Sequence, residues 1–194
     1  AALVALLTVS AFLIFLSPHY APKELQYPFF LETFGPAAGP GLPLKNVLSF
    51  FSHLKQMAVQ QDIAADPAAI PPPITRTGAS TVSIELETRE VIAEMEDGIQ
   101  FNYWTYNGTV PGPFLRVREG DTVTLKLTNH PSSIHKHNID LHAVTGPGGG
   151  AVATNVAPGE SKTLTFKALN PGLYVYHCAH PNVATHMAHG MYGL

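Results

Sequence analysis

The chain has 194 residues, of which 45% are hydrophobic and 13% are charged, and its formal net charge is −3 at pH 7. This length and apolar content suffice for one sizeable domain, and the charge offers no basic field that would attract nucleic acid. The single cysteine excludes an internal disulfide bond. Beside ten histidines, that cysteine is a candidate metal ligand or nucleophile as well as a candidate small buried hydrophobe.

The first sixteen residues, AALVALLTVSAFLIFL, carry no charge and are followed by Ser17 and Pro18. A membrane-spanning helix needs about 20 apolar residues, and the apolar part of a signal peptide about 7–15. Because the segment contains no clean small-x-small cleavage motif, we expect residues 1–17 to form an uncleaved membrane anchor. A cleaved export signal and a buried core helix are the alternatives. The anchor and the export signal both predict that the rest of the chain lies on the periplasmic side of a bacterial membrane.

Residues 18–80 have the composition of a spacer, because proline and alanine recur in GPAAGPGLPL and DPAAIPPPITRTG. Within it, LKNVLSFFSHLKQMAVQQ (44–61) has apolar residues at helical spacing and predicts one short amphipathic helix. His53 in this stretch has no partner histidine at ligand spacing, so we assign it a structural role. We expect no chemistry in residues 18–80.

From residue 81 the pattern changes to short strands separated by turns. Alternating or β-prone runs occur at 81–87, 99–106, 114–117, 122–128, 162–168 and 173–178. Turn pairs such as Asn107-Gly108, Pro158-Gly159 and Pro171-Gly172 separate them. The Gly-rich segment TGPGGGAVATN lacks the Lys-Ser/Thr of a phosphate-binding loop, so we expect a flexible turn there. Residues 81–194 are therefore predicted to be all-β, as a Greek-key β-sandwich.

The end of the chain gathers the soft metal ligands. Cys178, His186 and Met191 have the spacing C-x7-H-x4-M, and HKHNIDLH (135–142) supplies further histidines upstream. A thiolate, two imidazoles and a weak thioether form the ligand set of blue-copper electron-transfer centres. Sulfur stabilises Cu(I) and nitrogen accommodates Cu(II), so this mixture suits a copper ion that cycles between the two states.

Other chemistries remain as alternatives for these residues. Structural zinc usually takes two or more cysteines, or a compact Cys/His quartet, and this chain has one cysteine. A cupin site would use His135 and His137, but that motif expects a nearby glutamate. A Cys-His nucleophile pair is disfavoured because adjacent residues of a strand point to opposite faces.

The alternation of a strand separates two groups of ligands. His177 and Cys178 are adjacent and therefore face opposite ways, and His137 and His142 are five residues apart, an odd offset with the same effect. We therefore expect His137 with Cys178 around one metal and His142 with His177 around a second. Asp140 shares the face of His142, where its carboxylate could hydrogen-bond a bound water or oxyanion and pass a proton.

Three segments carry a resemblance to a known family: MEDGIQFNYWTYNGTVPGPFLRVREGDTVTLKLTN, HNIDLHAVTGPGGGAVATNVAPGESKTLTFKALNPGLYVYHCA and HMAHGMYGL. They resemble the first cupredoxin domain of copper-containing nitrite reductases, particularly the outer-membrane-associated branch, over residues 81–194. The resemblance implies a type 1 copper and a type 2 copper, with Asp140 as the catalytic aspartate. The implied type 1 ligands are His137, Cys178, His186 and Met191, and the implied type 2 ligands are His142 and His177.

The resemblance also implies partners. The substrate would be nitrite, reduced to nitric oxide in denitrification, and the electron donor a cupredoxin or c-type cytochrome. In the family a second cupredoxin domain and a neighbouring subunit of a homotrimer complete the type 2 site. We expect this sequence to be a fragment that ends before the last strand of its first cupredoxin domain and is inactive alone.

Two other functions account for part of the sequence. A membrane-tethered single-domain electron carrier accounts for the anchor, the spacer and the type 1 ligands, but not for the second group of residues. A laccase-like oxidase needs several His-x-His pairs, including one across the cysteine, where Ala179 stands. Of the other candidates, His135 is expected to make a local hydrogen bond and Trp104 to belong to the core, and His180 and His189 to be exposed loop histidines or a docking surface for the electron donor.

Overall fold

The computed structural model describes residues 58–194. The predicted anchor over 1–17 and most of the spacer lie outside the described residues. Within residues 58–194, no helix has the length and apolar character needed to cross a membrane.

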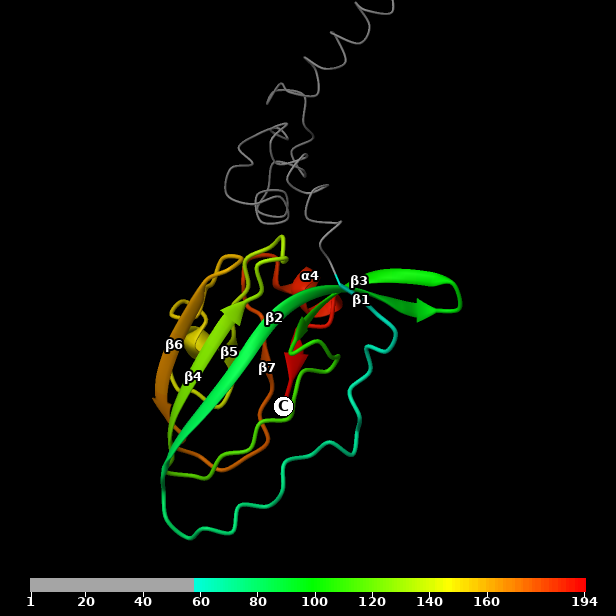
Figure 1. Ribbon diagram of the computed structural model, residues 1–194. Coiled ribbons are helices and arrows are strands. Elements are labelled where there is room, and N and C mark those ends of the chain that lie inside the picture. The colour runs from blue at the N-terminus through cyan, green and yellow to red at the C-terminus, as the bar shows by residue number, and fades with distance from the viewer. Residues whose placement is uncertain (1–57) are drawn as a thin grey trace, which may run out of the picture. The chain divides into compact units, whose positions relative to one another are not determined.

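A large sheet forms one layer of the molecule. Within residues 58–194 it contains five strands, in the order β1-β2-β4-β6 with β3 paired to β2. Their bounds are β1 Ala58–Gln60, β2 Thr81–Glu96, β3 Ile99–Tyr106, β4 Thr122–Asn129 and β6 Ser161–Lys167. The first half of the long β2 pairs in parallel with β4, and its second half pairs with β1 and β3. Figure 1 shows β2, β4 and β6 side by side in this layer.

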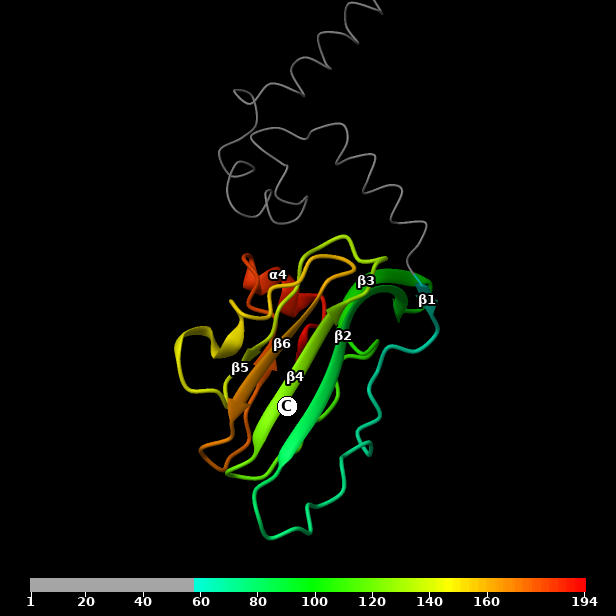
Figure 2. The same cartoon turned by 60° about the vertical axis from the view of Figure 1, so that its left-hand side comes forward.

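A small sheet lies against the large one. It contains β5 (Asp140–Leu141), β7 (Tyr176–His177) and β8 (Tyr192–Gly193), in the order β5-β7-β8. A short 3₁₀ helix, η2 (Pro147–Gly150), follows β5, and the six-residue α4 (Val183–Ala188) connects β7 to β8. The second view shows the two layers and the position of α4 at one end of them (Figure 2).

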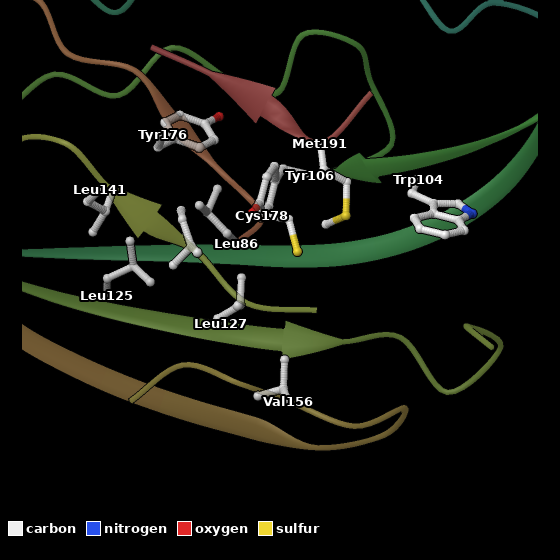
Figure 3. Close-up of a cluster of buried hydrophobic side chains, with 11 residues drawn as sticks. Leu86, Trp104, Tyr106, Leu125, Leu127, Leu141, Val156, Tyr176, Cys178 and Met191 are labelled. Carbon is white, nitrogen blue, oxygen red and sulfur yellow. The ribbon is translucent and has the colours of Figure 1, made fainter. Parts of the chain in front are cut away.

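The core lies between the two sheets. Along β4 the burial alternates, with Val123, Leu125 and Leu127 fully buried and the residues between them more exposed, as expected for a strand with one face on a core. Cys178 and Met191 belong to the same cluster of buried side chains as Leu125 and Leu127 (Figure 3). The predicted all-β sandwich is confirmed, and its core includes the soft ligands.

Some strands differ from the sequence-based prediction. The strand expected over 81–87 continues to Glu96, because its second half gains β1 and β3 as partners. Residues 114–117 form no strand. Leu115 makes its backbone bond to Leu194, outside any ladder of the described residues. Residues 58–60, at the end of the predicted amphipathic helix, are a strand because they pair with 91–93 of β2, and tertiary pairing overrides local periodicity.

The turn between β3 and the following segment is as the sequence predicts. Asn107 and Gly108 have φ values of 56° and 81°. Positive φ at two successive turn residues is the requirement of the hairpin turn that Asn-Gly favours.

A buried carboxylate ties the start of β4 to the segments beside it. Asp121 accepts backbone hydrogen bonds from Ser80 (2.9 Å) and Arg118 (2.7 Å) and an ion-paired hydrogen bond from Arg76. The bond from Arg76 lowers the pKa of Asp121 below its ordinary value, together with the backbone donors and against the effect of desolvation. Residues 76–80 are therefore held to the sandwich through one side chain.

We expect Asp121→Asn to lower the urea midpoint at pH 7, because the amide loses the ion pair and one acceptor oxygen. A carboxylate whose pKa is depressed in the folded state stabilises that state above the unfolded pKa of about 3.9, and the contribution is lost as the pH falls. The difference between wild type and variant should therefore narrow below about pH 4. Urea titrations at several pH values measure it, and a difference that stayed constant down to pH 2 would contradict this role.

Candidate metal centres

The exit of β7 separates two sets of side chains. Tyr176 and Cys178 are buried in the core, and His177 between them lies on the other face of the small sheet. Burial alternates in the same way over residues 139–142, with Ile139 and Leu141 buried and Asp140 and His142 more exposed, while His137 and Asn138 before them are both buried. Asp140 pairs directly with His177 across the β5–β7 ladder, so their side chains share a face.

His137, Cys178 and His186 form a buried cluster. One ligand atom from each lies within 4.8 Å of the others. The Nδ1 atoms of His137 and His186 are 3.2 Å apart, and the Cys178 Sγ is 3.3 Å from the His186 Nδ1. The three come from the segment before β5, from the end of β7 and from α4, and none exceeds 2% exposure.

Met191 is fully buried beside this cluster. Its backbone carbonyl accepts the Cys178 N–H at 3.1 Å, and its own N–H donates to His186 at 3.2 Å. In Figure 3 the sulfur atoms of Cys178 and Met191 reach into the same part of the core. The structure thus places Met191 beside Cys178 and His186, the two candidate ligands that precede it in the chain.

Asn138 holds the cysteine sulfur in place. Its backbone N–H points at the Cys178 Sγ at 3.5 Å, and its side-chain oxygen accepts the Ala179 N–H at 2.7 Å. An amide donor to a sulfur stabilises the thiolate form and orients it. Asn138 was not a candidate from the sequence, although its position next to His137 was the available signal.

Burial keeps this cluster neutral when no metal is bound. Desolvation raises the pKa of the Cys178 thiol to about 12, against the opposing effect of backbone hydrogen bonds from Asn138 and His180. Desolvation lowers the pKa of His137, and it lowers the pKa of His186 to about 2. At neutral pH the site therefore presents two neutral imidazoles and a protonated thiol.

Asp140, His142 and His177 form the second cluster. One ligand atom from each lies within 4.8 Å of the others, and the Nε2 atoms of the two histidines are 3.0 Å apart. Their rings are nearly perpendicular, with an interplanar angle of 71°. His177 is oriented through its Nδ1, which is 3.1 Å from the Cys178 carbonyl oxygen. The two Nε2 atoms therefore converge beside the Asp140 carboxylate, on the more exposed face of the small sheet.

The Gly-rich segment packs closely against Asp140. A Cβ atom at Gly149 would lie 2.2 Å from an Asp140 carboxylate oxygen and 2.6 Å from the backbone of Leu141, and the φ of Gly149 is 46°. A side chain cannot fit there. The segment expected as a flexible turn is therefore a close-packed support for β5.

The sequence analysis also missed Glu90. Its carboxylate is fully buried, and its Oε1 is 3.3 Å from the His137 Nε2 and 3.1 Å from the His135 Nδ1. The available signal was its register, because Glu90 follows Leu86 and Thr88 on the inward face of a strand.

The remaining aromatic and histidine candidates surround the buried cluster. Trp104 is buried, as predicted, and its ring contacts His186 at 4.7 Å between centroids and stacks on His189 at 4.2 Å. The local hydrogen bond predicted for His135 is confirmed by its contact with Glu90. The expectation of an exposed His180 is wrong, because its ring packs 5.5 Å from that of His186 and only 4% of the residue is exposed.

The fold with this buried Cys/His cluster defines a cupredoxin-type sandwich, and comparisons with known proteins give its family. A model of the multicopper oxidase family matches residues 87–194, and the chain belongs to this family. A copper-containing nitrite reductase of Neisseria meningitidis is 54% identical over 125 residues, which cover 64% of this chain and 32% of that protein. The chain therefore spans about a third of the length of this relative.

Solved structures agree with the family. A copper nitrite reductase from Nitrosomonas europaea has 39% sequence identity and a TM-score of 0.54, covering 58% of this chain and 40% of that one. A multicopper oxidase has 35% identity and a TM-score of 0.51, over 58% of this chain and 40% of its own. The resemblance to copper-containing nitrite reductases is confirmed by these relatives.

The donors fit the metal that the family implies. One sulfur and two neutral imidazole nitrogens meet in a buried, water-poor place beside a thioether, which is the combination that suits copper in both oxidation states. The second cluster offers two nitrogens and a carboxylate on the more exposed face of the sheet, a donor set that also suits copper.

Because the thiol is protonated at neutral pH, metal binding at the buried cluster should release one proton. We expect the affinity of the metal-free chain for Co²⁺, followed by its thiolate charge-transfer absorption, to rise about tenfold per pH unit between pH 6 and 8. His186, with its low pKa, adds no proton to this balance. Cys178→Ser is the control and should lose the absorption. An affinity independent of pH would contradict the protonated thiol.

Proposed function

We propose that this chain is the copper-binding first cupredoxin domain of a nitrite reductase that forms nitric oxide. His137, Cys178, His186 and Met191 would hold a type 1 copper, and His142 and His177 would contribute to a type 2 copper. The first copper would supply one-electron redox chemistry, and the second would supply a binding position for nitrite. The reduction consumes one electron and two protons for each nitrite and yields nitric oxide and water.

One observation carries the proposal. The buried cluster and the more exposed cluster each contain one of two consecutive residues. Cys178 belongs to the first and His177 to the second, and their side chains face opposite sides of the small sheet. Electron transfer between two centres is fastest through a short covalent path, and the single peptide between these residues provides one. We propose this peptide as the electron route.

Asp140 is placed to work on the substrate. Its carboxylate lies within 4.8 Å of both imidazole nitrogens of the accessible cluster and is held from below by the backbone around Gly149. In its protonated form Asp140 can donate a hydrogen bond to a bound oxyanion and deliver that proton to the oxygen that leaves as water, and it then takes up a proton from solvent on the more exposed face. We assign it the role of the proton donor.

The runner-up is a membrane-tethered carrier with a type 1 copper alone. Such a carrier gives no reason for Asp140, His142 and His177 to converge on the opposite face of the sheet. The convergence therefore favours the reductase over the carrier.

The names of the relatives suggest nitrite as the substrate. From the sequence we also propose an electron donor such as a cupredoxin or c-type cytochrome, and a homotrimer on the periplasmic side of a membrane, anchored through residues 1–17. An apolar groove of about 440 Å³, lined by Phe114, Leu173 and Val175 among others, supports a protein contact on this domain. Leu173 and Val175, which line this groove, are 70% and 40% exposed.

The buried centre is tested by Cys178→Ser in the copper-loaded chain. We expect the intense thiolate-to-copper absorption of the wild type to disappear, because a serine oxygen is too hard a ligand to give that transition. Asp140→Asn is the matched control and should retain the band. A band of unchanged strength in the serine variant would remove Cys178 from the metal site.

The accessible centre is tested by Asp140→Asn in the complete enzyme. General acid catalysis contributes about 10²–10⁴-fold, so we expect nitrite turnover to fall by that order while the thiolate band is preserved. Glu96→Gln, at an exposed acid on the end of the β2–β3 hairpin, should leave turnover unchanged. Turnover unaltered by Asp140→Asn would exclude this carboxylate from the mechanism.

A further inference from the structure

Glu90 is a buried carboxylate whose role is not explained by the fold. It lies on β2 with no exposed surface, and within residues 58–194 its ion-pair partners are two histidines and no lysine or arginine. A buried carboxylate without a cationic partner is costly unless hydrogen bonds satisfy it. The hydrogen bonds of Glu90 therefore indicate which segment of the chain it stabilises.

All of these bonds converge on one oxygen. Glu90 Oε1 accepts the backbone N–H groups of Ile134 (2.8 Å) and His135 (2.7 Å), and it also contacts the His135 Nδ1 (3.1 Å) and the His137 Nε2 (3.3 Å). The carboxylate thus holds the segment 134–137 through Ile134, His135 and His137 before the chain enters β5. His137 therefore lies at the end of a segment that the same carboxylate also holds at Ile134 and His135.

The chemistry of the carboxylate decides which nitrogen of His137 carries the proton. An ionised carboxylate only accepts, so the His137 Nε2 must be the protonated nitrogen. In a neutral imidazole the other nitrogen, Nδ1, then has a free lone pair. That atom is the one that lies 3.2 Å from the His186 Nδ1 and beside the Cys178 sulfur.

The side chains around His137 exclude water that could replace its hydrogen bond to Glu90. His137 is fully buried and Trp104 covers the cluster, with its ring centroid 5.6 Å from that of His137 and 4.2 Å from that of His135. Burial alone would raise the pKa of Glu90, but the hydrogen bonds from His135 and His137 lower it below its ordinary value. The two backbone N–H groups that donate to Oε1 also favour the ionised carboxylate, which lies one imidazole ring away from the other candidate ligands.

We propose that Glu90 is a positioning residue of the buried centre: its carboxylate fixes His137 as the Nε2–H tautomer with Nδ1 turned to the metal, and its charge lowers the reduction potential of the copper held there. The effect on the reduction potential rests on the proposed type 1 site, whereas the tautomer of His137 does not. A fixed negative charge stabilises Cu(II) more than Cu(I), which gives the direction of the effect. Hydrogen bonds that metal-bound histidines donate to carboxylates act in this way in many sites.

Two substitutions separate the hydrogen bond from the charge. Glu90→Gln keeps a carbonyl acceptor and removes the charge, whereas Glu90→Leu removes both. Asp121→Asn is the matched control, because it alters a buried carboxylate of similar size that holds Arg76 and the start of β4 and not the metal cluster. General loss of stability should affect all three variants alike.

The tautomer is measured first, on the metal-free full chain, by ¹⁵N NMR of the histidine side chains. In the wild type, in Glu90→Gln and in Asp121→Asn we expect His137 to be protonated on Nε2. In Glu90→Leu we expect a mixture of tautomers. A wild-type His137 protonated on Nδ1, or a Leu variant with the wild-type tautomer, would overturn the positioning role.

The potential is measured on the copper-loaded chain by titration of the thiolate band with redox mediators. Both Glu90 variants should favour Cu(I) over Cu(II) by about tenfold or more relative to the wild type, a rise of about 59 mV for a one-electron couple. Asp121→Asn should keep the wild-type potential. Equal potentials in all four proteins would overturn the electrostatic role, whereas a wild type without any thiolate band would overturn the proposed type 1 site and leave the NMR result valid.

Discussion

The alternation of side chains along one short strand governs the rest of this structure. Tyr176, His177 and Cys178 follow one another at the end of β7, so the outer two face the core and the middle one faces away. β5 pairs with this strand in a register that places Asp140 opposite His177. A shift of that register by one residue would bury the carboxylate and expose its apolar neighbours, so the apolar face of the small sheet fixes both clusters at once.

The two clusters have opposite environments, which suits opposite tasks. The Cys178 cluster is sealed between the sheets, where desolvation keeps its imidazoles neutral and its thiol protonated until a metal arrives. A rigid, dry site changes little when its metal changes charge. The Asp140 cluster lies on the more exposed face, where a small anion can reach two imidazoles and a carboxylate. In the proposed reductase, substrate binding and proton transfer would take place on one side of the sheet and electron exchange on the other.

The support around the buried cluster explains why it is held so closely. Asn138 fixes the sulfur, Met191 joins its backbone to both Cys178 and His186, and Glu90 fastens His137 from the neighbouring sheet. Each ligand is therefore attached to an element other than its own. Side chains that converge from separate segments keep their geometry only when such contacts limit their rotation, and the large sheet provides the fixed frame.

The sequence by itself determined the strand alternation, the Asn107-Gly108 turn and the division of His137, His142, His177 and Cys178 between two faces, because a period of two is a local property of an extended chain. The spacing of Cys178, His186 and Met191 likewise indicated candidate soft ligands, and the structure brings these three residues together. Only the tertiary structure decided that β2 continues to Glu96, that residues 58–60 join its edge, and that Glu90 and Trp104 reach the buried cluster. These contacts join segments far apart in the chain, and their formation depends on how two sheets pack, which no local pattern encodes.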